Sequence, residues 1–480
     1  MEPESLGNKA VSGAVWAAID RVGSMILQFV VNLVLARLLT PSDFGAIGML
    51  TIFIAVSMTL VDGGFASALI QKKESDQTDF STIFFWNVGV SILFYIILYF
   101  LSPCVSSFYG MPILSDILRV LGLIIILNGI VSVQVVKLQK NIQFKNIAVI
   151  NIISYGLGAA TSILLAFNGC GVWSLVALNL ISTISKIVIF YIVTRWHPNL
   201  IFSYESFKRL FSFGGYLLCA NLLQTGCQNA QGLIIGKQFS ASQLGFYTQA
   251  DKLNAVTSDS LPKIIIQVMY PVYSQLQDNR EKLANTVLMN IRVVAFIIFP
   301  ILFSLILTAD PIIEFLYGEK WLAAAPFFKI LCVGGIFTCL TNLNYYAVAA
   351  VGQSKALFWW SFYKWGVLLI LLIGSSFISM KALVWGITLS HFNIFMVNTF
   401  LSRKYVGIGL RKVMQALLPI SLISVTLFLS ISFLNNTLGP INWIFIIALF
   451  LIFYITISYI YKIKALGEIK ELLNHLKPSK

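Results

Sequence analysis

Charged residues are scarce in this sequence of 480 residues. Asp, Glu, Lys and Arg make up only 11% of it, whereas hydrophobic residues make up 58%. A soluble globular domain carries roughly 25% charged and about 45–50% apolar residues. Apolar runs of about 20 residues, the length of a membrane-spanning helix, recur along the chain. The composition therefore excludes an ordinary soluble enzyme and a disordered or fibrous protein.

Metal-ligating and nucleophilic residues are equally few. The chain has 3 histidines, which are scattered, and 6 cysteines, which lie in or beside apolar runs without a C-x-x-C pair. Neither a G-x-x-x-x-G-K-[ST] phosphate loop nor an H-E-x-x-H zinc motif occurs in the sequence. We therefore expect no metal site, no cofactor and no ATP hydrolysis by this chain, and we predict that it is not an enzyme.

The apolar runs predict about fourteen membrane-spanning helices. Their expected ranges are 11–37, 44–70, 82–102, 113–137, 146–167, 172–194, 211–236, 243–273, 284–308, 323–350, 355–378, 381–402, 413–434 and 441–461. The predicted fold is an all-α polytopic membrane protein. Its predicted parts are an N-terminal six-helix lobe (1–200), a C-terminal six-helix lobe (201–404), two extra spanning helices (405–463) and a cytoplasmic amphipathic tail (464–480).

Lys and Arg are distributed unevenly between the two sides of the predicted membrane. With the N-terminus inside, most of them fall in cytoplasmic connections, for example Lys140, Arg403 and Lys412. This bias is typical of the positive-inside rule and predicts that both termini are cytoplasmic. The net charge of +14 is then mainly a consequence of topology, and we expect no nucleic-acid partner.

The sequence contains an internal repeat. The segment Arg37-Leu-Leu-Thr-Pro-Ser-Asp-Phe-Gly45 aligns with Lys237-Gln-Phe-Ser-Ala-Ser-Gln-Leu-Gly245, and Phe108-Tyr-Gly110 aligns with Leu316-Tyr-Gly318. Each repeat unit contains an even number of predicted helices, so both have the same orientation in the membrane. The pattern predicts two lobes related by a pseudo-two-fold axis along the membrane normal, around a central cavity.

Polar side chains recur at helical spacing in three of the predicted spans. The stripes are Asp20, Ser24, Gln28 and Asn32, flanked by Arg21; Asn221, Gln224, Gln228 and Gln231; and Tyr247, Asp251, Asn254 and Ser258, beside Lys252. Amides alone often join helices by hydrogen bonds. The accompanying charges favour a water-filled cavity, because an ionisable group inside a membrane normally faces a cavity or a partner. Basic residues outnumber acidic ones in the spans, so we expect the cavity to attract an anion such as a phosphate.

Several short motifs resemble a known family. The segments Ala36-Arg-Leu-Leu-Thr-Pro-Ser-Asp-Phe-Gly45, Ala68-Leu-Ile-Gln-Lys-Lys73, Leu244-Gly-Phe-Tyr247 and Pro271-Val-Tyr-Ser-Gln-Leu-Gln277 are similar to those of bacterial polysaccharide and O-antigen flippases (lipopolysaccharide biosynthesis proteins). This family lies within the multidrug/oligosaccharidyl-lipid/polysaccharide exporter superfamily.

The resemblance implies a transporter in the bacterial cytoplasmic membrane that works by alternating access. Such proteins move undecaprenyl-pyrophosphate-linked oligosaccharide repeat units across the membrane for O-antigen, capsule or exopolysaccharide. Expected partners are this substrate, membrane lipid, a proton or sodium counter-ion, and polysaccharide polymerase and chain-length machinery.

The resemblance also suggests roles for individual residues. The predicted substrate-binding residues are Arg21, Lys252, Arg292, Gln28, Gln228 and Lys364, of which the first three would hold the pyrophosphate. The predicted ion-coupling or cavity acids are Asp20, Asp62 and Asp251. Asn221 stands where a symmetric second lobe would carry a charge, so a symmetric arginine clamp is not expected.

Three alternatives remain open from the sequence. A peptidoglycan lipid-precursor flippase would share the fold and the cavity charge. A cation-coupled multidrug antiporter would have a net acidic cavity instead of a net basic one. A membrane polysaccharide polymerase would need a large exterior loop or clustered catalytic acids, and the nearest acidic cluster (Asp310, Glu314, Glu319) is predicted to lie in a short connecting loop.

Overall fold

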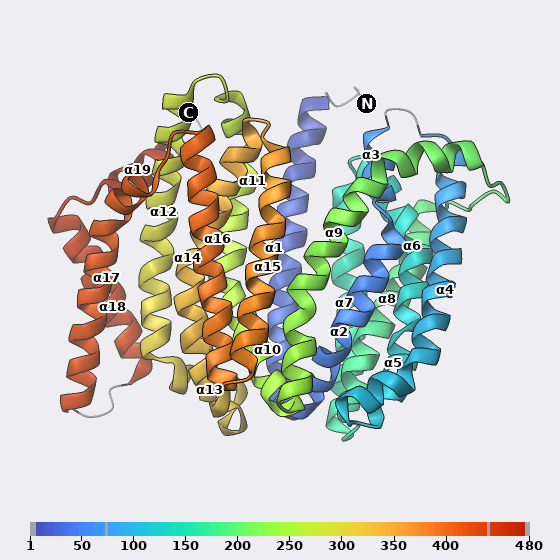
Figure 1. Cartoon of the computed structure of the whole chain (residues 1–480), viewed down its shortest axis with the longest axis horizontal. Coiled ribbons are helices and arrows are strands. Elements are labelled where there is room, and N and C mark those ends of the chain that lie inside the picture. Colours follow the sequence, from blue (N-terminus) through green and yellow to red (C-terminus); the bar gives the residue numbers. More distant parts are fainter. Residues whose placement is uncertain (1–5, 73–74, 439–441, 476–480) are drawn as a thin grey trace. The chain divides into compact units, whose positions relative to one another are not determined.

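The computed structural model describes residues 6–72, 75–438 and 442–475, and in these residues all regular elements are helical (Figure 1). The first are α1 (Leu6–Leu38), α2 (Pro41–Asp62), α3 (Phe65–Gln71), α4 (Gln77–Tyr109), α5 (Ile113–Leu121), α6 (Leu123–Lys140), α7 (Phe144–Phe167), α8 (Val172–Thr194) and α9 (Tyr204–Gln238). They are followed by α10 (Ala241–Ala255), the π-helical turn η1 (Val256–Ser260), α11 (Leu261–Gln275), α12 (Arg280–Leu307), α13 (Ala309–Tyr317), the 3-10 turn η2 (Glu319–Ala324), α14 (Ala325–Ala350), α15 (Ser354–Ser376), α16 (Met380–Tyr405), α17 (Leu410–Leu438), α18 (Trp443–Ile460) and α19 (Lys464–His475).

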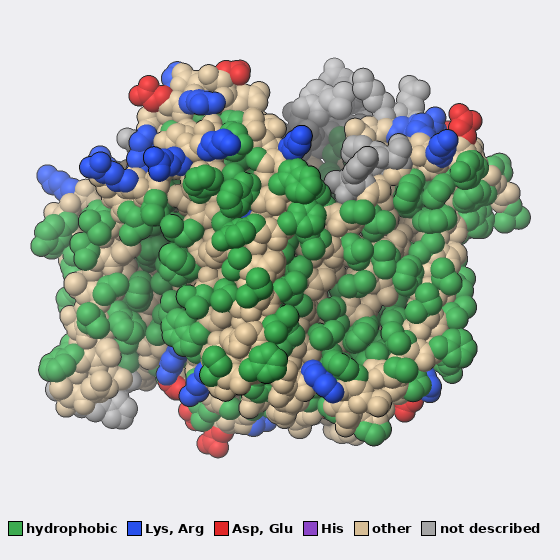
Figure 2. All heavy atoms as spheres, viewed as in Figure 1, with side chains coloured by type: hydrophobic (Ala, Val, Ile, Leu, Met, Phe, Trp, Pro, Cys, Tyr) green, Lys and Arg blue, Asp and Glu red, His purple; other side chains and the backbone are tan. Residues whose placement is uncertain are grey.

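Twelve helical segments in the described residues are long and apolar enough to cross a membrane. Hydrophobic side chains cover the flanks of the helices, and charged side chains gather towards the helix ends (Figure 2). The two further predicted spans are present as α9 and as α10–η1–α11, but their amide and charged side chains make them less apolar than the twelve. The prediction of an all-α polytopic membrane protein is confirmed.

Several predicted spans are interrupted within their length. The span predicted over 44–70 breaks between α2 and α3, where Gly63 and Gly64 have φ values of 54° and 74°. The carboxylate of Asp62 accepts backbone hydrogen bonds from Gly64 and Ala66 at this break. In the span predicted over 243–273, the π-turn η1 ends two residues before Pro262, which cannot donate a backbone hydrogen bond. Sequence periodicity does not reveal such local breaks.

One prediction about a connecting segment was wrong. The acidic cluster that contains Asp310 and Glu314 was expected in a loop, whereas the structure forms the short helix α13 there, followed by η2. The N–H of Gly318 bonds to the carbonyl of Glu314 at the end of α13, and Asp310 forms an ion pair with Lys329 of α14. The helix forms because its apolar residues Ile312 and Ile313 are buried.

The chain divides into two compact units, Met1–Gly245 and Phe246–Lys480. In the first unit, α7 packs against α8 and α1, and α9 packs along α2. In the second, α14 lies between α12 and α16, while α17, α18 and α19 pack against α12. These units are defined by contacts rather than by the repeat, so the predicted lobe and tail boundaries stay a prediction, and residues 1–5 and 476–480 lie outside the described residues.

The predicted repeat is visible in how two helices begin. At the start of α2, Thr40 and Asp43 form a capping box, in which the hydroxyl of Thr40 accepts from the N–H of Asp43 and the carboxylate of Asp43 accepts from the N–H of Thr40. At the start of α10, the hydroxyl of Ser240 accepts from the N–H of Gln243 at 3.2 Å. Such a bond satisfies one of the otherwise unpaired N–H groups of a first helical turn. The two aligned segments therefore begin their helices in the same way.

The aligned segments also pack against each other reciprocally. A Cβ atom added at Gly45 would lie 1.8 Å from the carbonyl oxygen of Ala241, and one added at Gly245 would lie 1.9 Å from the carbonyl oxygen of Pro41. Under the repeat, Gly45 corresponds to Gly245 and Pro41 to Ala241. The contact is thus the same on both sides, as expected for elements related by a pseudo-two-fold axis.

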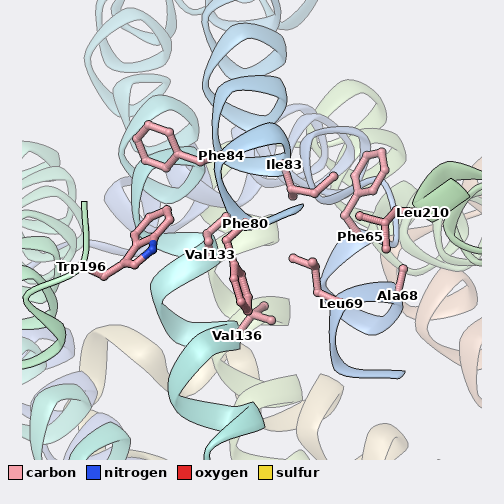
Figure 3. Packing of buried hydrophobic residues seen from close by; sticks show 10 residues of the cluster. All are labelled: Phe65, Ala68, Leu69, Phe80, Ile83, Phe84, Val133, Val136, Trp196 and Leu210. Carbon is pink, nitrogen blue, oxygen red and sulfur yellow. The ribbon is translucent and has the colours of Figure 1, made fainter. Parts of the chain in front are cut away.

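The core at one end of the first unit is rich in aromatic side chains (Figure 3). It consists of Phe65, Ala68, Leu69, Phe80, Ile83, Phe84, Val133, Val136, Trp196 and Leu210. Trp196 belongs to the segment that joins α8 to α9, and its indole N–H donates to the side-chain oxygen of Gln77 at 2.6 Å. Two further backbone N–H groups of this segment, of Asn199 and Ser203, donate to Ser81 and Thr82 of α4 at 3.0 Å. The connection is therefore fixed to the start of α4.

A buried carboxylate lies beside this core. The side chain of Asp79 is fully buried and forms ion pairs with Lys72 and with Arg209 of α9, the latter at 3.1 Å. It also accepts the backbone N–H of Asp76 at 3.2 Å. Asp79 thus joins the α3–α4 connection, α4 and α9. Because a buried carboxylate needs all of its donors, this network stabilises the packing of these elements against one another.

We predict that Asp79→Asn lowers the free energy of unfolding by about 2–4 kcal/mol, because it leaves two cations without their shared anion. The expected value lies below that of a fully buried pair, since the side chains of Lys72 and Arg209 are 25% and 55% exposed. The unfolding midpoint in detergent measures the effect. The control is Asp116→Asn, in which an exposed carboxylate loses Arg119 as partner and which we expect to cost less than about 1 kcal/mol. Equal midpoints for the two variants would contradict the role of Asp79.

Candidate functional site

The polar stripe of α1 lies partly exposed in the first unit. Arg21 and Gln28 are exposed. Asp20 is held in place, because its carboxylate accepts hydrogen bonds from the amide of Asn151 on α7 at 3.2 Å and from the hydroxyl of Ser24 at 3.3 Å. Lys186 of α8 is close enough to Asp20 for electrostatic attraction. One side of the stripe therefore binds α7 and α8, and the other presents a guanidinium and an amide.

A second polar stripe runs along α9. Asn221, Gln224 and Gln228 are exposed, and they lie three or four residues apart on one helical face. Other side chains attach α9 to α2, for example through the 3.2 Å hydrogen bond between the hydroxyls of Thr59 and Thr225. Since α9 is held by this different face, the amides are free to contact a polar ligand.

The third stripe surrounds the π-turn in the second unit. Asp251 and Lys252 lie next to each other near the end of α10, and the charge of Asp259 in η1 acts on Asp251. Asp259 forms an ion pair with Lys263 and attracts His391 of α16. Single π-helical turns inside helices are frequent at functional sites.

Two buried polar atoms near this π-turn have no hydrogen-bond partner among the described residues: Oδ1 of Asn254 and Nδ1 of His391. Oδ1 of Asn254 lies against Gly335, and Nδ1 of His391 lies against Gly334, so the two groups contact adjacent residues of α14. An unsatisfied buried polar atom costs free energy unless a water, an ion or a ligand binds it.

Lys364 lies in a different place, inside the bundle of α14, α15 and α16. Its side chain is only 6% exposed, and its ammonium donates to Oδ1 of Asn398 at 3.2 Å and lies 5.5 Å from the ring centre of Tyr345. Tyr345 contacts Tyr346, which in turn contacts Tyr270 of α11. This buried lysine therefore lies at the inner side of a row of tyrosines that are half-buried or exposed.

Arg292 of α12 also has its own partner. Its guanidinium forms a two-pronged ion pair with Glu468 of α19, with Nε 3.0 Å from each carboxylate oxygen. This geometry is the strongest form of the arginine–carboxylate interaction. The predicted site residues thus fall into three groups. Asp251 and Lys252 lie together in the second unit, and Asp20, Arg21 and Gln28 share one helix in the first. The remaining ones have other neighbours: Asp62, Arg292 and Lys364.

Some residues of these clusters were not predicted. Tyr345 and Tyr346 belong to the sequence Asn342-Leu-Asn-Tyr-Tyr346, a short polar and aromatic run inside an apolar span, which could have indicated them. The position of Asn398 carries no such signal, because it depends on how α15 and α16 pack. In the described residues, no group of three or more His, Cys, Asp or Glu side chains is placed to hold a metal ion.

Comparison with known sequences decides the family. A family model described as polysaccharide biosynthesis protein matches residues 34–326, which is more than half of the chain. The chain belongs to this polysaccharide biosynthesis protein family. The family resemblance predicted from the short motifs is confirmed.

The chain is similar to several curated relatives over most of their length. It is 27% identical to the teichuronic acid biosynthesis protein TuaB of Bacillus subtilis over 76% of each chain. It is 26% identical to the succinoglycan biosynthesis transport protein ExoT of Rhizobium meliloti over 72% of this chain and 70% of that one. It is 27% identical to the lipopolysaccharide biosynthesis protein WzxC of Escherichia coli over 70% and 69% of the two chains.

Solved structures confirm the fold of this polysaccharide biosynthesis protein. The lipid II flippase MurJ in an inward closed conformation superposes with a TM-score of 0.76, at 13% identity, over 93% of this chain and 98% of that one. An inward-facing multidrug transporter of the MATE family superposes with a TM-score of 0.61, at 15% identity, over 81% and 98%. At such low identity the similarity concerns the fold alone, and the chain is a multi-pass membrane protein that shares this two-lobe fold.

Proposed function

We propose that this protein is a flippase that moves undecaprenyl-pyrophosphate-linked oligosaccharide repeat units across the bacterial cytoplasmic membrane by alternating access. The observation that carries the proposal is the exposed polar stripe on spanning helix α1, with Arg21 and Gln28, in a chain of the polysaccharide biosynthesis protein family. A guanidinium inside a membrane needs an anionic or polar partner, and a diphosphate provides one. The amides along α9 supply polar contacts that suit a sugar.

The same proposal assigns a sidedness to the molecule. In the second unit, three lysines lie at helix ends beside short connections. Lys404 is close to the end of α16, whereas Lys412 and Lys464 are at the starts of α17 and α19. We place this basic end on the cytoplasmic side by the positive-inside rule, and the bias of Lys and Arg along the sequence supports the same side for both chain termini. The protein then works without covalent chemistry of its own, together with the enzymes that build and polymerise the repeat units.

Lys252 and Gln228 complete the proposed substrate contacts, because both are exposed on helices that carry polar stripes. Lys364 is proposed to act together with Tyr345, Tyr346 and Tyr270, whose half-buried or exposed rings are available to stack on sugars. Arg292 is held by Glu468, so we do not assign it to the pyrophosphate.

A peptidoglycan lipid-precursor flippase and a multidrug antiporter have the same fold, and the relatives distinguish these alternatives better than the fold does. TuaB, ExoT and WzxC are named for the biosynthesis of teichuronic acid, succinoglycan and lipopolysaccharide, and none of these three names refers to peptidoglycan or to drugs. Complementation tests the proposal: expression in strains that lack their own repeat-unit flippase should restore surface polysaccharide in at least one. Rescue only of a strain that lacks its lipid II flippase would favour the peptidoglycan alternative.

We further propose that the cluster around η1 binds the coupling ion, a proton or sodium. It offers the carboxylates of Asp251 and Asp259 together with Oδ1 of Asn254 and Nδ1 of His391, of which the last two have no partner among the described residues. Intramembrane carboxylates commonly carry protons or bind ions in coupled carriers. The predicted acids Asp20 and Asp62 accept hydrogen bonds from neighbouring side chains or backbone, so we assign them a secondary part in coupling.

Asp251→Asn tests the coupling proposal, because an amide cannot exchange a proton or supply a negative charge to sodium. We expect the variant to lose the dependence of transport on an imposed proton or sodium gradient while transport without a gradient persists. Transport in reconstituted vesicles, with and without each gradient, measures this. The control is Asp278→Asn, which changes an exposed carboxylate outside the cluster. A variant that still responds to the gradient as the unchanged protein does would contradict the proposal.

A further inference from the structure

A large groove lies in the second unit, away from the residues assigned to transport. It has a volume of about 1000 Å³ and is formed by α12, α17, α18 and the turn that leads into α19. Its apolar wall consists of Leu288, Ala416, Pro419, Ile420, Leu422, Ile423 and Ile457. The volume is at the upper end of the range for small-molecule sites, about 300–1,000 Å³. An apolar groove of this size on a membrane protein suits the hydrocarbon chain of a lipid.

One end of the groove carries a concentration of positive charge. Lys412, Lys462 and Lys464 line it together with Arg292. The ammonium of Lys412 donates to the carbonyl oxygen of Gly407 at 3.1 Å, and in the described part of the chain neither Lys462 nor Lys464 forms an ion pair. Since an ammonium has three donors, each lysine can bind an additional anion.

Lys462 occupies an unusual backbone position. Its φ is 47°, in the left-handed region, at the turn that ends α18, where the N–H of Ile463 bonds to the carbonyl of Ser458 at 3.0 Å. Glycine usually occupies this position after a helix, because the Cβ atom of any other residue is strained in this conformation. Lys462 lines the groove in spite of this strain, and backbone strain of this kind is concentrated at binding sites.

The ion pair between Arg292 and Glu468 fixes the wall that α19 contributes. Ala465 of α19 is fully buried, and Glu468 one turn later binds Arg292 of α12. The first turn of α19, with Lys464, is thereby held against the end of the groove. The positive charges are consequently presented by a rigid element rather than by a free tail.

We infer that the groove binds an acidic phospholipid of the surrounding membrane, with its phosphate at Lys412, Lys462 and Lys464 and an acyl chain along the apolar wall. Two complementary features support this occupant: the groove is apolar along its length, and its charged residues are concentrated at one end, as in the lipid itself. Basic pockets beside spanning helices commonly bind anionic headgroups. The inference does not depend on the substrate that the protein carries.

Native mass spectrometry of the delipidated, full-length protein tests the inference, with phosphatidylglycerol and phosphatidylcholine of identical acyl chains as probes. Each lysine near an anionic lipid contributes about a fivefold gain in affinity. We therefore expect phosphatidylglycerol to bind at least tenfold more tightly than phosphatidylcholine. Lys462→Gly should weaken it about fivefold, and the combined variant Lys412→Ala, Lys462→Gly and Lys464→Ala on the order of a hundredfold.

Lys462→Gly also separates binding from folding, because glycine relieves the left-handed backbone. Its unfolding midpoint should be unchanged or raised while its lipid affinity falls. The matched control is Lys355→Ala, which removes an exposed lysine outside the groove and should leave the lipid affinity unchanged.

Several outcomes would overturn the inference. Equal binding of the two phospholipids, or unchanged affinity in the combined variant, would show that the lysines do not hold a headgroup. Displacement of phosphatidylglycerol by inorganic phosphate at equal concentration would indicate a site for an ion rather than a lipid. Tighter binding of undecaprenyl phosphate than of phosphatidylglycerol, lost in the combined variant, would assign the groove to the isoprenoid.

Discussion

Gly45→Ala and Gly245→Ala are each expected to abolish the accumulation of folded protein. A methyl group at either position would lie 1.8 or 1.9 Å from a backbone carbonyl oxygen. A backbone atom cannot avoid the methyl group by changing rotamer, so the starts of α2 and α10 would have to separate. Overpacking costs about 1–3 kcal/mol where side chains can adjust, and we expect at least about 3 kcal/mol for each substitution.

Size-exclusion profiles and unfolding midpoints in detergent measure this effect. Gly89→Ala is the matched control: Gly89 lies within α4, a Cβ atom there would meet nothing within 4 Å, and alanine favours helix by about 1 kcal/mol. Because the two glycines belong to one reciprocal contact, the double variant should cost less than the sum of the single ones. Normal amounts of folded protein with Gly45→Ala would contradict the close packing of the two repeats.

Arg21→Ala is expected to reduce surface polysaccharide to less than about a tenth of the normal amount in a complemented strain. A hydrogen bond to a charged group contributes about 1.5–3 kcal/mol, so loss of the guanidinium should weaken pyrophosphate binding by a factor of roughly 10–100. Since Arg21 is exposed and forms no ion pair with the described residues, the substitution should leave protein abundance unchanged.

Two variants make this result specific. Arg21→Lys retains the charge but not the fork of donors, and we expect intermediate export. Lys381→Ala removes an exposed lysine at the start of α16 and should export normally. Normal export with Arg21→Ala would remove Arg21 from the proposed site.

The sequence predicted the architecture well because the physics of a membrane span is local. A run of about 20 apolar residues is sufficient to identify a spanning helix. The repeat could also be predicted, because the aligned segments 37–45 and 237–245 share helix-capping residues and glycines that permit close approach of two backbones. Local breaks are less visible, because the break at Gly63 and the π-turn η1 leave the hydrophobic pattern unchanged. Only residue types, the pair of glycines after Asp62 and Pro262, indicate that a helix could bend there.

The candidate site was less predictable, because a charge in a span does not show what it faces. Arg21 and Arg292 look alike in sequence, yet Arg21 is exposed on α1 whereas Arg292 is bound by Glu468, which is 176 residues away in the chain. Lys364 likewise finds Asn398 on another helix. Partners of this kind are set by tertiary packing, and periodicity along one helix carries no information about them.

Translocation in proteoliposomes tests the proposed function most directly. The purified full-length protein is reconstituted with an undecaprenyl-pyrophosphate-linked oligosaccharide, and the fraction of that lipid exposed on the outer leaflet is followed with a sugar-oxidising or lectin probe. We predict that the protein moves the oligosaccharide lipid across the bilayer and that Arg21→Ala does so at least tenfold more slowly. The test is repeated with repeat units from every polysaccharide that the protein restores in cells. If translocation is then no faster in vesicles with the protein than in vesicles without it, the proposed function is contradicted.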